Sequence, residues 1–498
     1  MYRLRAYIIL PSLLLFLSLV LSCASTQNGG ARRRISELEA FGGDVAYAAE
    51  LVQEGGGTEG ERLELLARLA VALAERGEED AALEAVTIGS ERLSTLSETP
   101  ADASRVSAGL AEGYARLERT DAAAERLESG RLYALRAPEV EERAELLAAL
   151  VLTAARGEGV YAEATRAVLD EIYVLDDPDL RSATILNVAD TLSREEVAVD
   201  LSNLLQQSIP AAAEIANPYV RGARYARISG LFRALGDIPS ARSLTEKGVQ
   251  VVDSATQPVE QVDELEGVGV LAGHLRERGL LAEAQDVIRR IPLESERAWE
   301  MARLAREAQA RGETGRGREI AEEAVELINR VRGRPAEVLA AQGLLARFYR
   351  DLGSTERSDP LVRRVASTLA DAPATPSYQE PFIQLLLYRI EAGEVGTLRE
   401  IVRISDSADF RARLLIELAQ REELVNDERL QAGIQRQAAG EDPRELSRQT
   451  QLDLVAGLLS NELLNEALRL LEETGDPYVR AAGYIEILRR FPDYSGPI

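Results

Sequence analysis

The stretch Asn217–Gly248, NPYVRGARYARISGLFRALGDIPSARSLTEKG, sets a pattern that the rest of the chain repeats. It opens with an asparagine and a proline, a common start for a helix. Large apolar residues then recur at three- and four-residue steps, as one face of a helix requires, at Tyr225, Ile228, Phe232 and Leu235. Gly236 and Asp237 end this helix, and Pro239 and Ser240 begin a second. The stretch therefore predicts a helical hairpin.

The residues expected between the two helices are small. Ser229 lies on the first helix, and Ala241 and Gly248 lie on the second. Small side chains let two helix axes approach closely. A single hairpin of this size cannot bury its apolar faces alone, so we expect similar hairpins to be stacked on either side of it.

The same order of large, small, large and helix-breaking residues recurs along the chain. One example is Leu271, Ala272 and Leu275 before a glycine at 279. The breaking glycines are Gly77, Gly157, Gly236, Gly279, Gly312, Gly353 and Gly393. Their spacing gives a unit of about 40 residues, and the starts Asn217-Pro218 and Asp476-Pro477 introduce nearly identical segments.

This order resembles the tetratricopeptide repeat (TPR), whose signature runs Leu-Gly-x-x-Tyr and later Ala-x-x-x-Phe. The resemblance implies an all-α fold, an α-solenoid of stacked helical hairpins, here about ten to twelve of them. A HEAT-like solenoid is the alternative, because its unit is also near 40 residues, and a non-repetitive helical bundle is the third reading. We expect TPR-like repeats over residues 35–372, a proline-rich loop or joint over 373–381, and further repeats over 382–498.

Residues 1–22 have the pattern of a signal peptide: Arg3 and Arg5 precede an almost wholly apolar run. The run ends at Cys23, the only cysteine, and resembles a bacterial lipoprotein signal. The resemblance implies cleavage before Cys23 and acylation of its thiol and amine, which would anchor the chain in a lipid bilayer. Residues 23–34 are small, polar and then basic, so they are expected to be a flexible tether.

The composition favours helices and limits the partners. Aromatic residues make up only 5% of the 498 residues, and the net charge is −25. Nucleic acid and anionic lipid headgroups would be repelled by this charge, so neither is an expected partner, whereas a basic protein surface or a cationic ligand is permitted.

No known catalytic constellation is found in the sequence, so we expect neither an enzyme nor a cofactor or metal. His274 is the only histidine, and we expect it to be a packing or surface residue. Gly267-x-Gly269-x-x-x-Gly273 lacks the spacing of a dinucleotide loop, and helix packing accounts better for it. Pairs such as Glu422-Glu423 are assigned to solvated helix faces.

Arg221 and Arg480 follow equivalent helix starts. In the TPR family, basic residues on the concave face can hold a partner's carboxylate, so these two are candidate partner-binding residues. Pairing with nearby Glu is the alternative. The resulting hypothesis is a lipoprotein of the bacterial cell envelope, facing the periplasm, that acts as a scaffold or assembly adaptor for envelope proteins. The alternatives are a solute- or peptide-binding accessory lipoprotein of an uptake system and a carboxylate-dependent hydrolase.

Overall fold

The structure is a computed structural model that describes residues 34–155, 162–194, 200–255, 262–333, 335–372, 374–424, 427–492 and 494. Within these ranges the chain is all-α and contains no strand, so the predicted fold class, an α-solenoid of stacked hairpins, is confirmed. The signal peptide, Cys23 and most of the tether lie outside the described residues, as does Gly157.

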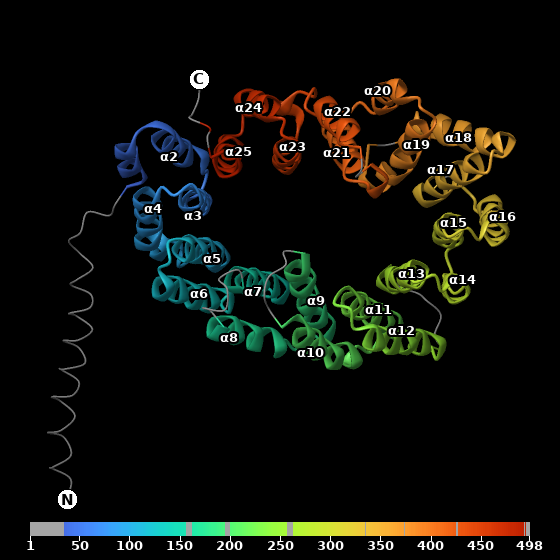
Figure 1. The fold of residues 1–498 in the computed structure, drawn as a ribbon, viewed down its shortest axis with the longest axis horizontal. Coiled ribbons are helices and arrows are strands. Elements are labelled where there is room, and N and C mark those ends of the chain that lie inside the picture. The colour runs from blue at the N-terminus through green and yellow to red at the C-terminus, as the bar shows by residue number, and fades with distance from the viewer. Residues whose placement is uncertain are drawn as a thin grey trace, which may run out of the picture.

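The helices form two concentric layers in which inner and outer helices alternate along the chain (Figure 1). The inner helices are α3 (Glu59–Glu75), α5 (Pro100–Arg116), α7 (Val140–Ala155), α9 (Pro178–Arg194), α11 (Pro218–Ala234), α13 (Val262–Glu277), α15 (Glu294–Ala310), α17 (Ala336–Asp351), α19 (Gln379–Glu391), α21 (Ala408–Ala419), α23 (Arg448–Ser460) and α25 (Pro477–Arg490). The outer helices are α2 (Gly43–Gly55), α4 (Glu79–Arg92), α6 (Thr120–Ala134), α8 (Ala162–Tyr173), α10 (Leu201–Glu214), α12 (Ile238–Asp253), α14 (Leu281–Ile288), α16 (Thr314–Arg330), α18 (Thr355–Leu369), α20 (Leu398–Val402), α22 (Glu428–Ala438) and α24 (Leu464–Glu473). Short 3-10 helices are η1 (Ile35–Phe41), η2 (Leu93–Leu96), η3 (Pro376–Tyr378), η4 (Val395–Thr397), η5 (Glu422–Leu424) and η6 (Pro443–Glu445).

The solenoid closes on itself to form a ring (Figure 1). Each inner helix packs on the next, and α25 at the end of the chain packs on α3 at its beginning. The outer partner of α25 is α2, which comes from the other end of the chain. One hairpin is therefore shared between the two ends, and it completes a set of twelve in the described chain. The sequence predicted a superhelix but gave no sign that it would close.

The shared hairpin has an apolar core and a charged rim. Tyr47 of α2 meets Tyr484 of α25 edge to face, with ring centroids 4.9 Å apart. Around them, Arg448 forms a 2.6 Å ion pair with Glu61, and Arg489 forms a 2.8 Å ion pair with Glu75. Buried side chains from both ends of the chain belong to the same apolar cluster. The seam, as we call the junction of α25 with α2 and α3, is therefore packed like any other junction between repeats.

Local sequence explains how each hairpin begins and turns. The Asn217 side chain accepts hydrogen bonds from the backbone N–H groups of Tyr219 and Val220, which caps α11, and Asp476 caps α25 in the same way. Gly236 has a φ of +82° in the turn between α11 and α12, a conformation that glycine adopts without strain. Glu118 and Glu462 occupy the equivalent positions at φ of +57° and +58°.

The opening hairpin is confirmed in detail, with one correction. Ser229, Ala241 and Gly248 are buried at the helix contact, as expected. Leu235 was assigned to the buried stripe, but α11 ends at Ala234 and Leu235 is 41% exposed. The reason is that Leu235 already belongs to the turn, where the chain leaves the packed face.

Packing continues across the proline-rich residues 373–381. Pro376 begins η3, and α19 already starts at Gln379, so Pro381 lies in its first turn. Helix α17 packs on α19, and a Cβ placed on Gly343 of α17 would come within 2.8 Å of the Cβ of Gln384.

Candidate functional site

The two arginines predicted to bind a partner contact the backbone of the linker before their own helix. Arg221 donates to the carbonyl of Ile215 at 3.1 Å, and Arg480 donates to the carbonyl of Thr474 at 3.4 Å. Arg143, Arg181 and Arg411 make the same contact with the carbonyl six residues earlier. This repeated bond holds the linker against the following inner helix, and partner binding by Arg221 and Arg480 stays a prediction.

A pocket of about 960 Å³ lies on four consecutive inner helices, α9, α11, α13 and α15, and we call it the inner pocket. Its volume is in the range of small-ligand sites. It is lined by Asp190, Arg194, Ala226, Arg227, Gly230, Leu231, Ala234, Gly269, Val270, Gly273, His274, Arg276, Glu277, Ile291, Leu293, Glu296, Trp299, Glu300 and Arg303. Both the only histidine and the only tryptophan of the chain are among these residues.

Two glycines of α13 leave space for the pocket. A Cβ on Gly269 would meet nothing within 4 Å, and one on Gly273 would meet only the Arg276 side chain at 3.5 Å. Gly267 differs, because a Cβ there would lie 2.9 Å from the backbone oxygen of Tyr219. Helix packing, the explanation expected from the sequence, therefore holds for Gly267, whereas Gly269 faces open space.

His274 is 9% exposed and is held by the first hairpin. Its Nε2 lies 3.1 Å from Ser229 Oγ and 3.2 Å from Thr245 Oγ1. Both hydroxyls donate to the Ala241 carbonyl, so Nε2 carries the proton that is shared with them. Of the two expectations for His274, a packing or a surface residue, these contacts agree with packing.

Burial lowers the pKa of His274 to about 4, and the nearby Arg278 and Arg233 add to this effect. The imidazole is therefore neutral near pH 7. Its Nδ1 has no hydrogen-bond partner among the described residues and would lie 3.7 Å from a Cβ on Gly230, another lining residue. Nδ1 is thus a free acceptor in the wall of the pocket.

Two arginines of the pocket lining share one buried carboxylate. Arg276 and Glu300 are 7% and 6% exposed, and Arg276 Nη1 donates to Glu300 Oε2 at 2.9 Å. Arg303 donates to Glu300 Oε1 at 2.7 Å and lies over the Trp299 ring, 5.7 Å from its centroid. A buried carboxylate with two cationic partners is well compensated, so this group fixes the wall of the pocket.

Glu296, one turn before Glu300 on α15, has no cationic partner among the described residues. Burial raises its pKa, and the carboxylates of Glu337 and Glu300 raise it further. No hydrogen bond or ion pair holds its side chain within the described residues. Glu296 is thus a carboxyl group whose charge is opposed by its neighbours, at a pocket wall with Trp299 three residues further along the same helix.

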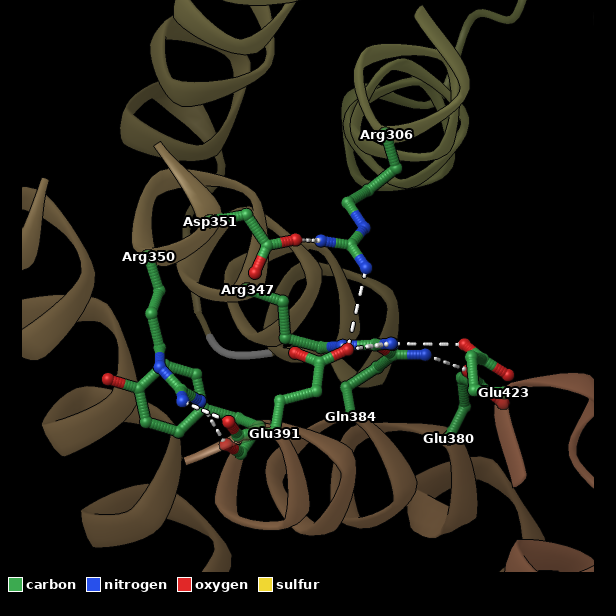
Figure 2. Close-up of polar contacts among 9 residues, drawn as sticks. Arg306, Arg347, Arg350, Asp351, Glu380, Gln384, Glu391 and Glu423 are labelled. Atoms are coloured by element: carbon green, nitrogen blue, oxygen red, sulfur yellow. Dashed lines mark hydrogen bonds and ion pairs between the residues drawn. The ribbon is translucent and has the colours of Figure 1, made fainter. Parts of the chain in front are cut away.

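A second polar group lies next to the pocket in the ring, where α15, α17 and α19 meet η5 (Figure 2). Arg347 is 1% exposed and donates to Gln384, Glu391 and Glu423 at 2.8, 2.6 and 3.1 Å. Glu391 also receives a 3.5 Å contact from Arg306. Glu423, assigned from the sequence to a solvated face, is exposed but also pairs with this buried guanidinium. Because these bonds run between different helices, the group holds α15, α17, α19 and η5 together.

The sequence did carry a signal for the inner pocket. The residues six positions before the turn glycines are Val71, Gly230, Gly273, Arg306, Arg347 and Leu387. The two consecutive hairpins with glycine at this position contribute α11 and α13, the middle two of the four inner helices that line the pocket. No sequence motif marks the other pocket residues, Arg276, Glu296, Trp299 and Glu300. Their role depends on burial and on contacts between repeats, which the sequence does not show.

In the described part of the chain, no group of three or more His, Cys, Asp or Glu residues is placed to hold a metal ion. None of the described helices is both long enough and apolar enough to span a bilayer.

The fold defines the class of this chain as a helical-repeat protein closed into a ring. No protein-family model matches the chain, and no curated protein matches it. Among solved structures, it is similar to TPR-like repeats of a kinesin light chain from Podosopora anserina (22% identity, 39% of this chain and 98% of that chain, TM-score 0.29). It is also similar to a human IFIT1 dimer with PPP-AAAA (13%, 84% and 95%, TM-score 0.29) and to the quorum sensor NprR from B. thuringiensis (13%, 67% and 98%, TM-score 0.25). The repeat class rests on the twelve hairpins described above.

Proposed function

We propose that this chain is a lipid-anchored scaffold of the bacterial cell envelope, on which envelope proteins assemble. One observation carries the proposal: twelve hairpins form a closed ring whose inner helices make one continuous surface. Helical-repeat proteins bind their partners on such surfaces. The net charge of −25 argues against a nucleic-acid partner.

The anchor in this proposal is an acylated Cys23. The residues from Cys23 to the start of η1 at Ile35 could extend over at most about 40 Å, so acylation would keep the ring near the membrane surface. Replacing Cys23 with Ala should abolish labelling by a fatty-acid analogue and release the protein from the membrane fraction. Absence of lipid label on the native chain would remove the anchor from the proposal.

The scaffold function can be tested by crosslinking in living cells. A photoreactive residue is placed at Val270, which lines the inner pocket, or at Glu283, which is exposed on outer helix α14. The inner position should capture a defined set of envelope proteins that the outer position does not capture. Equal capture from both positions, or none, would contradict binding to the inner helices.

The inner pocket supports a second candidate, a solute- or peptide-binding accessory lipoprotein of an uptake system. Its volume of about 960 Å³ is large enough for a small solute. A saturable, solute-dependent rise in melting temperature, lost when the pocket is filled by Gly269→Leu, would favour this candidate over the scaffold.

A further inference from the structure

The arginines that line the inner pocket already have acceptors. Arg194 pairs with Asp190 at 2.7 Å, and Arg227 donates to Asn187 at 3.2 Å. Arg276 and Arg303 share Glu300, as described above. An anionic ligand would therefore have to compete with bonds that are already made.

The groups left without partners in the same wall are acceptors. Glu296 has no side-chain hydrogen bond or ion pair among the described residues, and His274, nine-tenths buried, has a free Nδ1. An unsatisfied acceptor beside a pocket is stabilised by a donor from a ligand. The unpaired carboxylate of Glu296 adds a preference for a donor that carries positive charge.

The pocket also offers a surface for such a cation. Trp299 lies three residues after Glu296, on the same side of α15, and tryptophan is the best aromatic partner for a cation. The indole of Trp299 already has one guanidinium over it, that of Arg303. A cation stacked on Trp299 is therefore compatible with this wall of the pocket.

We propose that the inner pocket binds a cationic guanidinium or ammonium group at Glu296 and Trp299, with Nδ1 of His274 accepting a hydrogen bond from the same ligand. This deepens the proposed scaffold function, on which it rests, by naming the chemistry of the partner: a segment with Arg or Lys. A free amine has the same chemistry, so the test must separate the two sources.

Two probes separate a protein segment from a free amine. The first is acetyl-Gly-Gly-Arg-Gly-Gly-amide, with the uncharged citrulline peptide as its isostere, and the second is free agmatine. Because Trp299 is the only tryptophan, selective excitation of tryptophan reports directly on the pocket. Isothermal titration calorimetry provides the affinity independently.

The arginine peptide should bind saturably, while the citrulline peptide should not. Glu296→Gln should weaken binding by about tenfold or more, because it removes a charge-assisted hydrogen bond. Glu283→Gln on the outer helix α14 changes the net charge equally and should leave the affinity unchanged. Equal binding by both peptides, or an unaffected Glu296→Gln variant, would overturn the proposal.

The outcomes also distinguish this inference from the scaffold function. Binding of agmatine without the peptide would support a cation site but contradict a protein segment as its source, and so the scaffold as stated. Specific crosslinking from Val270 without binding of either probe would retain the scaffold and overturn the cation site. Circular dichroism of the Glu296→Gln variant checks that the ring is still folded.

Discussion

The hydroxyl of Tyr478 on α25 donates a 3.1 Å hydrogen bond to the carboxylate of Glu64 on α3, 414 residues earlier in the chain. The bond crosses the seam where the two ends meet. An open solenoid has two exposed ends that need capping repeats. Here each end covers the other, so the stability of the end repeats depends on closure.

Closure can be disturbed at Gly55. A Cβ at this position would lie 2.8 Å from the Cβ of Ala481 and 3.0 Å from the carbonyl of Pro477. We expect Gly55→Val to destabilise the seam by about 1–3 kcal/mol through overpacking, and small-angle X-ray scattering should show a larger radius of gyration. Gly315→Val is the matched control, because a Cβ there meets nothing within 4 Å. A scattering curve identical to that of the wild type would contradict the role of this contact.

The turn between α5 and α6 contains a strained residue that can be relieved. Glu118 has a φ of +57°, whereas the equivalent Gly236 has +82°. A left-handed conformation costs a non-glycine residue about 1–2 kcal/mol, so Glu118→Gly should raise the free energy of unfolding by about 1 kcal/mol. Gly236→Ala should lower it by a similar amount. Urea denaturation measures both, and changes of the same sign would refute this account of the turns.

Folding stability should depend on pH through His274. Its pKa is about 4 in the fold against 6.5 for an ordinary histidine, so the unfolded chain takes up a proton first as the pH falls. The contribution of His274 to the free energy of unfolding is therefore full above about pH 6.5. It decreases by about 3 kcal/mol as the pH falls towards 4. His274→Gln should remove this part of the decrease, measured as the difference between variant and wild type in urea titrations at several pH values. Parallel pH profiles would show that His274 titrates normally.

Arg347 should be among the most sensitive positions in the ring. Arg347→Met would leave Gln384, Glu391 and Glu423 without their common donor. Glu423 is exposed and Glu391 keeps a contact from Arg306, so we expect the unfolding free energy to fall by about 1–3 kcal/mol. Arg316→Met removes a more exposed arginine that pairs with Glu313, and it should change the unfolding free energy by less than about 1 kcal/mol. A similar loss in both variants would show that burial of Arg347 is unimportant.

The repeated hairpin was predictable because its causes are local. The cap at Asn217, the turn at Gly236 and the small residues Ser229 and Gly248 lie within one short stretch, and periodicity reveals them. Closure of the ring was not predictable. The apolar periodicity of α2 and of α25 predicts a helix in each case, but it does not indicate that these two helices pair with each other.

The inner pocket was only partly predictable. Gly230 and Gly273 recur at one position of two neighbouring hairpins, a pattern that can be seen in the sequence. The pairing of Arg276 with Glu300 and the lack of a partner for Glu296 depend on how α13 and α15 are placed in space. Cys23, by contrast, is a prediction from sequence that the described residues do not test.

The hairpin formed by α2 and α25 has a consequence for biosynthesis. Helix α2 leaves the ribosome early, but its partner α25 is among the last segments to be made, so the first unit begun is the last to be completed. Until then, the face of α2 that carries Tyr47 and Gly55 lacks its partner α25, and joining ends so distant in sequence is a slow event. Chaperones that shield such faces until the ring closes would therefore be expected to increase the yield of this protein.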